Sequence, residues 1–304
     1  MPLFSTIVPV YNREKLVGAT LESVFAQEFT DQEVIVVDDG STDGSLAVVS
    51  RYGPRVEVLQ QQNKGPSAAR NQALSRASGE YVAFLDSDDV WFPWTLATYA
   101  RVINDHDRPA VITGRPFVFG QEAELAGAAR DGVRVERFAD YLASGGEWRW
   151  FGVSSFVIRR DVLRAAGGFD ERWRVSEDAD LMLRIGASGT FVHVASPYTF
   201  GYREHPASLK GDITLAVAGN RHLIATEASG GYPGGRGRRR ERRRIIARHL
   251  RPFTLQLLEA GRRADAWAMY FSTLSWHVAE ARWKYLLGFP SRAMRSRSHG
   301  KATP

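Results

Sequence analysis

The sequence of 304 residues contains no cysteine. Disulfide bonds, thiolate nucleophiles and cysteine-bound zinc are therefore excluded. The sequence also lacks an apolar run of the roughly 20 residues needed to span a bilayer. Its first residues have no basic stretch ahead of a long apolar core, as a signal peptide would. We therefore expect a cytoplasmic protein, with peripheral attachment to the inner face of the cell membrane as the alternative.

Positive charge is concentrated in one segment. The formal net charge is +6, but residues 236–251 contain nine arginines and one glutamate and contribute +8, so the rest of the chain has a charge of about −2. Hydrophobic residues make up 44% and charged residues 24% of the sequence, which is ordinary for a globular protein. The basic character is thus local and does not describe the whole chain.

Short β-branched runs alternate with helical patterns over the first ninety residues. Asn12 is expected to cap the first of these helices. Strands joined by helices pair in parallel through right-handed crossovers, and the ligand crevice of such a sheet lies at the carboxyl ends of its strands. The predicted strands are residues 5–10, 33–37, 55–59 and 80–85.

The remaining sequence predicts three further regions. Between residues 110 and 210 the pattern is mixed, with strands expected at 111–119, 152–158, 191–194 and 199–202. We therefore expect one α/β domain over residues 1–210, with halves 1–109 and 110–210. Two basic amphipathic helices, 238–260 and 263–287, are expected within a helical region 211–290, followed by a disordered tail 291–304.

Acidic residues follow two of the predicted buried strands. Asp86 and Asp88 form an Asp-x-Asp pair, and a divalent cation held by such carboxylates can neutralise a diphosphate leaving group. We predict Mn²⁺ or Mg²⁺ at Asp88; a solvated turn is the alternative. Asp39 could accept the N3–H of uracil or thymine, whereas a helix-capping role is the alternative for the Asp38-Asp39 pair.

Two further segments contain charged groups suited to catalysis. Arg70 lies in a predicted helix whose N-terminus favours anions, so it could contact a phosphate or pair with an acid. Glu177 and Asp178 begin a later helix, where a carboxylate could take a proton from a hydroxyl group. Complementarity with the helix dipole is the alternative for this acidic pair.

Several loop residues are weaker candidates. His205 could supply a metal ligand or a phosphate contact, or be structural. Trp148, Trp150 and Trp173 lie in predicted loops, where their rings could stack on sugars; packing is the alternative for each.

Taken together, these segments resemble glycosyltransferase family 2, the inverting enzymes of the GT-A fold. The resemblance implies a Rossmann-like, mostly parallel central sheet flanked by helices, followed here by a helical C-terminal extension. The matching stretches occur in family order over about two thirds of the chain: STIVPVYN (5–12), VIVVDDGSTD (34–43), NKGPSAARN (63–71), GEYVAFLDSDD (79–89), GGFDE (167–171) and SED (176–178).

The resemblance also implies residue roles. Asp88 would be the direct metal ligand and Asp178 the catalytic base, with Glu177 beside it in the acceptor pocket. Nucleotide-sugar binding would fall to Pro9, Tyr11, Asp39, Arg70 and Asp86.

The implied reaction is metal-dependent transfer of one sugar from a UDP- or dTDP-sugar to a hydroxyl acceptor, with inversion. The acceptor would be a glycan, or a lipid-linked one, in the synthesis of cell-surface polysaccharide or glycoconjugates. Arg282-Trp283 lacks the glutamine of the Gln-x-x-Arg-Trp motif of processive synthases, which favours transfer of a single sugar.

Three rival interpretations remain at this point. Asp86 to Val90 also fit the Asp-x-Asp-x-Val motif of haloacid-dehalogenase-type phosphatases, with Asp86 as nucleophile. The arginine-rich segment could make the protein a binding protein for nucleic acid or anionic lipid. Apolar residues accompany the arginines, so we expect no nucleic acid and instead a membrane surface for residues 236–290, or packing on the catalytic body. An inactive family member is disfavoured because Asp39, Asp88 and Asp178 are present.

Overall fold

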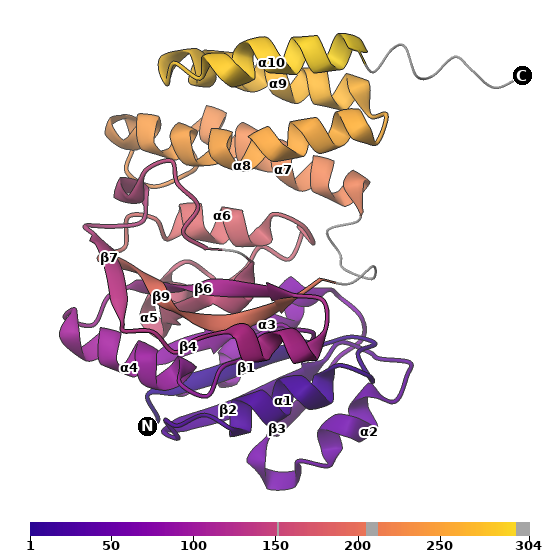
Figure 1. Cartoon of the computed structure of the whole chain (residues 1–304), viewed down its shortest axis with the longest axis vertical. Coiled ribbons are helices and arrows are strands. Elements are labelled where there is room, and N and C mark those ends of the chain that lie inside the picture. The colour runs from indigo at the N-terminus through magenta and orange to yellow at the C-terminus, as the bar shows by residue number, and fades with distance from the viewer. Residues whose placement is uncertain (151, 205–211, 296–304) are drawn as a thin grey trace, which may run out of the picture. The chain divides into compact units, whose positions relative to one another are not determined.

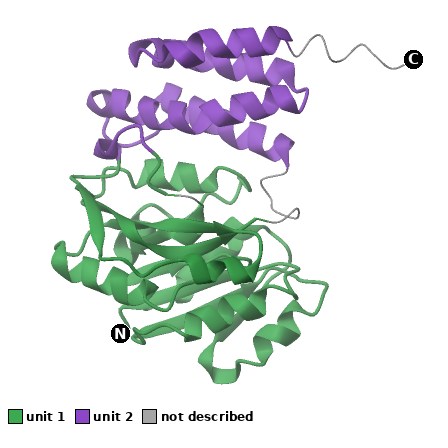
Figure 2. Ribbon diagram, viewed as in Figure 1, with its two compact units in different colours: residues 1–141, 148–211 green, residues 142–147, 212–304 purple. Residues whose placement is uncertain are grey.

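The computed structural model describes residues 1–150, 152–204 and 212–295. The chain divides into two compact units, residues 1–141 with 148–211, and residues 142–147 with 212–304 (Figure 2). The first unit contains the sheet and the second is helical. The short segment 142–147 thus belongs to the helical unit, although it is surrounded in sequence by the first.

The N-terminal half of the sheet is parallel. Its strands lie in the order β3-β2-β1-β4 and are joined by α1 (Val17–Phe25), α2 (Ser45–Ser50) and α3 (Pro66–Arg76) (Figure 1). Every residue of β1 is buried, as expected for a strand covered on both faces. The predicted parallel pairing is confirmed for β1 (Phe4–Val10), β2 (Gln32–Asp38), β3 (Glu57–Gln60) and β4 (Tyr81–Phe84).

Beyond β4 the same sheet becomes mixed. It continues with β8 (Phe156–Arg159), β6 (Val111–Phe119), β9 (Phe191–Arg203) and β5 (Val90–Trp91), while β7 (Arg134–Phe138) also pairs with β9. Only the β6–β9 pair is parallel among these described strands. The other elements of this unit are α4 (Thr95–Asp105), α5 (Arg160–Ala165), α6 (Glu177–Arg184), and the 3-10 turns η1 (Gly53–Arg55), η2 (Glu122–Gly127) and η4 (Val153–Ser155).

Three local predictions for this unit are wrong. The strands expected at 191–194 and 199–202 are one strand, because register shifts near Gly114 and Arg115 of β6 keep its partner paired throughout. The strand expected at 152–158 begins only at Phe156, after η4. Asn12 does not cap α1: its Oδ1 accepts a hydrogen bond from the N–H of Thr42 (2.8 Å) and so joins the loops after β1 and β2.

The helical unit contains more helices than the sequence predicted. Its elements are η3 (Leu142–Ser144), α7 (Ile213–Ser229), η6 (Arg236–Arg238), α8 (Arg239–Glu259), α9 (Arg263–Ala279) and α10 (Trp283–Arg295). Helix α7 was missed, and the stretch 263–287 is divided where Ala281 adopts a positive φ of 49°. The predicted disorder of residues 291–304 is wrong for Ser291 to Arg295, because these residues belong to α10. Among the described residues, no helix is long and apolar enough to cross a membrane.

The apolar side of α8 is buried within its own unit. Ile246 and Leu257 have no exposed surface, and Ile245, Leu250 and Leu258 are also buried. These side chains were expected to face a membrane or to pack on the catalytic body; the structure shows them packed against other elements of the helical unit, chiefly α7 and α9. The arginines of α8 are mostly buried or half-buried as well, and Arg240 is the most exposed of them, so the helix presents no exposed apolar face beside a basic one.

A buried histidine couples this unit to pH. His277 of α9 has no exposed surface, and its ring lies 4.4 Å, centroid to centroid, from that of Tyr285 in α10. Burial, with the positive charges of Arg251 and Arg282, lowers the pKa of His277 to about 4. The folded state therefore keeps this imidazole neutral at pH 7.

We predict that His277 weakens the protein in acid. An unfolded histidine with a pKa near 6.5 binds a proton that the folded protein does not bind until about pH 4, so the free energy of unfolding falls as the pH drops through this window. His277→Gln removes this contribution. Urea unfolding at pH 7 and pH 5 should show a smaller acid-induced loss for the variant, and equal losses would contradict the assignment.

Candidate functional site

The loops after β1, β2 and β4 leave the parallel sheet at the same edge. Val10 pairs with Asp38, and the N–H of Leu85 donates to the carbonyl of Ile7 (3.0 Å). Tyr11, just beyond β1, is 43% exposed, so its ring is accessible to a ligand. Pro9, by contrast, is buried in the strand.

Asp39 organises the loop that leads into α3. Its Oδ1 accepts hydrogen bonds from Gln61 Nε2 (2.7 Å) and the N–H of Lys64 (2.8 Å), and its Oδ2 accepts one from the N–H of Gly65 (2.8 Å). A carboxylate has about four acceptor positions, so roughly one stays available for a ligand. Asp39 is 3% exposed, which makes it a structural residue with room for a single further donor.

Arg70 bridges two acidic loops. Its Nη2 donates to Asp86 Oδ1 (2.7 Å) and its Nη1 to Glu177 Oε1 (3.0 Å), and the guanidinium lies over the ring of Phe169. The side chain is buried, so these charge-assisted bonds compensate for the lost hydration of the cation. The expected alternatives for Arg70 were a phosphate or an acid, and the structure shows two acids.

The acidic pair at the start of α6 is electrostatically strained. Burial, followed by the charge of Asp178, raises the pKa of Glu177 to about 7, and the ion pair with Arg70 only partly opposes this. Ser176, immediately before α6, adopts a left-handed φ of 66°, which is uncommon for a residue other than glycine. Asp178 is only half-buried, so of the two carboxylates it is the more accessible.

Asp88 and Asp89 lie in different environments. Asp88 Oδ2 is 3.3 Å from Arg13 Nε, and this pair is partly exposed. Asp89 is 2% exposed and accepts hydrogen bonds from Ser154 Oγ (2.6 Å) and the N–H of Arg203 (3.0 Å). Burial, with the charges of the two neighbouring aspartates, raises the pKa of Asp89. Asp89 therefore fixes the loop, while Asp88 remains accessible.

The loop 167–176 is fastened to α3. Asn71 Nδ2 donates to the carbonyl of Phe169 (2.9 Å), and Asn71 Oδ1 accepts from the N–H of the same residue (2.8 Å). Gly168, with φ of 73°, leaves space for this contact, because a Cβ there would lie 2.3 Å from Asn71 Oδ1. Ser67 Oγ also donates to the carbonyl of Trp173 (3.1 Å).

The three tryptophans proposed to contact the acceptor differ in exposure. Trp148 is 48% exposed, and Trp173 is half-buried in the loop 167–176. Trp150 is buried, and its Nε1 donates to Tyr141 Oη (2.9 Å), so packing is the role that the structure describes for it. His205 lies outside the described residues.

The acidic loop offers donors suited to a hard cation. Asp86 and Asp88 supply carboxylate oxygens, which Mn²⁺ and Mg²⁺ accept as ligands. Each is also paired with an arginine, at 2.7 Å for Asp86 with Arg70 and 3.3 Å for Asp88 with Arg13. The donor chemistry therefore fits such an ion, and the longer Arg13 pair is the one that a cation at Asp88 would replace.

Four residues of this network were missed from the sequence: Arg13, Asn71, Ser154 and Arg203. Arg13 and Asn71 adjoin or end recognised motifs, so their positions could have suggested a role. Ser154 and Arg203 come from η4 and β9, and no local pattern links either residue to the acidic loop.

Comparison with known proteins identifies the family. The sequence model described as Glycosyl transferase family 2 matches residues 5–166, more than half of the chain. The chain belongs to glycosyltransferase family 2. A model described as Glycosyltransferase like family 2 also matches residues 137–227. The expected family is thus confirmed, and membership in it replaces the phosphatase interpretation of Asp86.

Relatives of this family-2 chain include proteins of cell-wall polysaccharide synthesis. An uncharacterized glycosyltransferase of Nostoc sp. is 32% identical over 232 residues, covering 74% of this chain and 68% of the relative. The putative teichuronic acid biosynthesis glycosyltransferase TuaG of Bacillus subtilis is 46% identical over 141 residues, covering 45% of this chain and 52% of TuaG.

A solved structure supports the predicted GT-A fold. The crystal structure of Staphylococcus aureus TarS 1–349 in complex with UDP-GlcNAc matches 97% of this family-2 chain and 91% of that chain, with a TM-score of 0.72 and 20% identity. TarS is a poly(ribitol-phosphate) β-N-acetylglucosaminyltransferase, and this chain is 44% identical to it over 127 residues, covering 40% of this chain and 22% of TarS.

We predict that Arg70 is a principal stabilising residue of the site. Arg70→Ala leaves two acids without their cation and should cost about 3–5 kcal/mol of unfolding free energy. Arg76→Ala is the matched control on the same helix, because its ion pair with Glu57 is exposed; it should cost less than about 1 kcal/mol. Urea unfolding measures both, and similar losses would contradict the prediction.

Proposed function

We propose that this family-2 glycosyltransferase moves one sugar from a UDP- or dTDP-sugar to a hydroxyl group of a glycan acceptor, with inversion, in the synthesis of cell-surface polysaccharide. The observation that supports this best is the Arg70 bridge, which joins the acidic loop after β4 to the acidic pair of α6. A group that binds the leaving diphosphate and a group that deprotonates an acceptor are thereby held in one network.

The nucleobase of the donor would lie at the loops after β1 and β2. Tyr11 offers an exposed ring for stacking, and Pro9 is buried in β1 two residues before it. Asp39 has about one acceptor position left after its three hydrogen bonds. Uracil or thymine needs one such position for N3–H, whereas guanine presents two adjacent donors and would leave one unsatisfied. This argument favours UDP or dTDP over GDP.

A divalent cation would be held by Asp88, assisted by Asp86. When bound, it would neutralise charge on the diphosphate as the sugar leaves. Arg13, released from Asp88, would remain close to the same charge. Arg70 is committed to two carboxylates, so its role is to position Asp86 and Glu177.

The chemical step would be a single displacement at the anomeric carbon. The acceptor oxygen forms a bond to that carbon, the bond to the diphosphate oxygen breaks, and the acceptor proton moves to the Asp178 carboxylate. Asp178 suits this role because it is more exposed than Glu177, whose Oε1 is bonded to Arg70. Glu177 would instead maintain the geometry of the α6 N-terminus.

The sugar acceptor would meet the loops around residues 148 and 173. Among the described residues of these loops, Trp148 and Trp173 are aromatic side chains with exposed surface. The kinship with TuaG and TarS supports a cell-wall polymer as acceptor class. A lipid-linked acceptor is a variant of the same proposal, because the reacting hydroxyl is chemically the same.

Nucleotide selectivity tests the donor assignment. In calorimetric titrations with Mn²⁺ present, UDP or dTDP should bind about tenfold or more tightly than GDP, corresponding to one satisfied hydrogen bond to the base. Omission of the metal should weaken binding. Tighter binding of GDP would refute the proposed role of Asp39.

Asp178→Asn tests the role of Asp178 as the catalytic base. Loss of the base should lower kcat by about 10²–10⁴-fold while UDP binding stays within a few-fold of wild type. Asp161→Asn, at the exposed start of α5, is the control and should leave both unchanged. Release of UDP from the donor in the presence of acceptor polysaccharide measures turnover. Near wild-type kcat in Asp178→Asn would remove that residue from the base role.

A further inference from the structure

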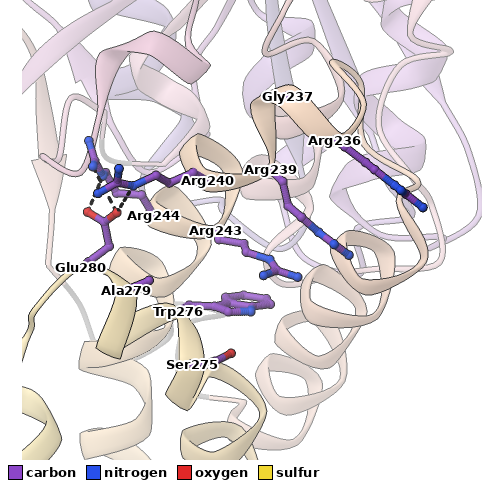
Figure 3. A pocket seen from close by; sticks show the side chains of 10 residues that line it. All are labelled: Arg236, Gly237, Arg239, Arg240, Arg243, Arg244, Ser275, Trp276, Ala279 and Glu280. Atoms are coloured by element: carbon purple, nitrogen blue, oxygen red, sulfur yellow. Dashed lines mark hydrogen bonds and ion pairs between the residues drawn. The ribbon is translucent and has the colours of Figure 1, made fainter.

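The helical unit contains a pocket that the proposed reaction does not use. It has a volume of about 330 Å³ and is formed by η6, the start of α8 and the end of α9 (Figure 3). Its charged lining consists of five arginines and one acid: Arg236, Arg239, Arg240, Arg243, Arg244 and Glu280. A lining with such an excess of cations is suited to an anionic ligand.

The acid neutralises only part of this charge. Glu280 binds Arg240 (2.9 Å) and Arg244 (2.7 Å), as the dashed lines in Figure 3 show. Arg236 has no acidic partner among the residues that the structure describes. The other two arginines, Arg239 and Arg243, are near an acid that lies outside the pocket lining.

The acid outside the lining, Glu227, already pairs with another arginine. Glu227 of α7 has no exposed surface, and its Oε2 is 2.6 Å from Arg242 Nε. Its other oxygen is 3.4 Å from Arg243 and 3.7 Å from Arg239, and Arg243 Nε has no hydrogen-bond partner among the described residues. Arg243 Nε itself is buried, but within the described part of the chain no hydrogen bond engages the terminal Nη groups of Arg236, Arg239 or Arg243, so three guanidinium groups of the pocket retain donors for a ligand.

An aromatic ring orients one of these groups. The guanidinium of Arg243 lies over Trp276, 5.2 Å from the ring centroid, and Figure 3 shows Arg239 and Arg243 projecting from α8 on the side of this ring. A stacked guanidinium keeps its N–H groups free at the edge and loses little entropy when it binds an anion. Phosphate oxygens match this planar fork of donors.

The size of the pocket and the burial of the apolar side of α8 favour a phosphate on a polar chain over a membrane surface. The volume is at the lower end of small-molecule sites and suits one phosphorylated sugar or polyol unit. Interfacial membrane helices place an apolar face beside their basic residues. The apolar face of α8 is buried in its own unit, so this helix lacks such a face.

We infer that this pocket binds phosphate ester groups of an anionic glycan or polyol-phosphate chain, and that the acceptor belongs to this chemical class. The second clause rests on the proposed function. Arg236, Arg239 and Arg243 donate to the phosphate oxygens, and Trp276 holds Arg243 in place. Glu280 competes with the ligand for Arg240 and Arg244.

Binding of poly(glycerol phosphate) tests the pocket directly. The full chain should bind this polymer and not uncharged dextran. Arg239→Gln combined with Arg243→Gln should weaken binding about tenfold or more. Arg221→Gln combined with Arg262→Gln removes two charges elsewhere in the same unit and should have little effect. Binding of the polymer to the pocket variant as tightly as to wild type would overturn the inference.

A variant that is expected to raise polymer affinity distinguishes loss of the pocket from unfolding of the protein. Glu280→Gln releases Arg240 and Arg244, so polymer affinity should rise severalfold, which a misfolded protein would not show. Arg236→Gln alters only an exposed side chain and should weaken binding. No change in affinity for both variants would also overturn the assignment.

Two further arms identify the phosphate source and separate this inference from the proposed reaction. Vesicles of phosphatidylglycerol that bind in place of the polymer, or inorganic phosphate that binds as tightly as the polymer, would overturn the assignment to a chain. UDP binding should be unchanged in every pocket variant. Polymer binding without sugar transfer would contradict the proposed function and the acceptor assignment that rests on it, and would leave the phosphate-binding pocket standing. Transfer to the polymer that is insensitive to the pocket variants would contradict only the assignment of this pocket.

Discussion

The hydrogen bonds of one buried guanidinium hold the catalytic unit together. Burying the charge of Arg70 is unfavourable unless carboxylates meet it, and Asp86 and Glu177 come from segments about ninety residues apart. In the folded unit the acidic loop after β4 and the start of α6 therefore both meet α3 at this side chain. The same side chain joins the proposed leaving-group site to the acidic pair of α6 in one network. The contacts that compensate the buried charge thus also set the spacing of the groups proposed to react.

Around this bridge, side chains replace regular backbone pairing. Asp39 binds backbone amides of the loop before α3, Asn71 binds both backbone groups of Phe169, and Asp89 binds the backbone of Arg203. Each bond joins a loop at the sheet edge to an element distant in sequence. These loops contain no secondary structure that could fix them, so buried polar side chains supply the missing partners. The loops of the site are thus joined by side-chain hydrogen bonds where regular secondary structure is absent.

The sequence predicted the parallel half of the sheet because buried strands and intervening helices repeat there with strong periodicity. It also predicted that Tyr11, Asp39 and the acidic loop lie at one edge of the sheet, because the carboxyl ends of parallel strands meet at the same edge. It could not reveal Ser154 or Arg203, because their contacts arise from tertiary pairing of η4 and β9 with the acidic loop. Asn12 was misassigned as a cap because its link to Thr42 is nonlocal. Helix α7 was missed because its apolar residues follow no clear single face. The burial of the α8 apolar face likewise depends on helices that the local pattern does not specify.

The path of the chain has a consequence for how the helical unit can be separated. Residues 142–147 belong to that unit even though the sheet-containing unit continues until residue 211. Arg248 donates to the carbonyl of Glu147, and the side chains of Arg244 and Arg282 lie against Gly146. Cutting the chain after residue 211 would strip this short segment of its partners and expose its backbone within the remaining protein. The two units are therefore interleaved rather than modular, and recombination at a single junction would not exchange the helical part intact.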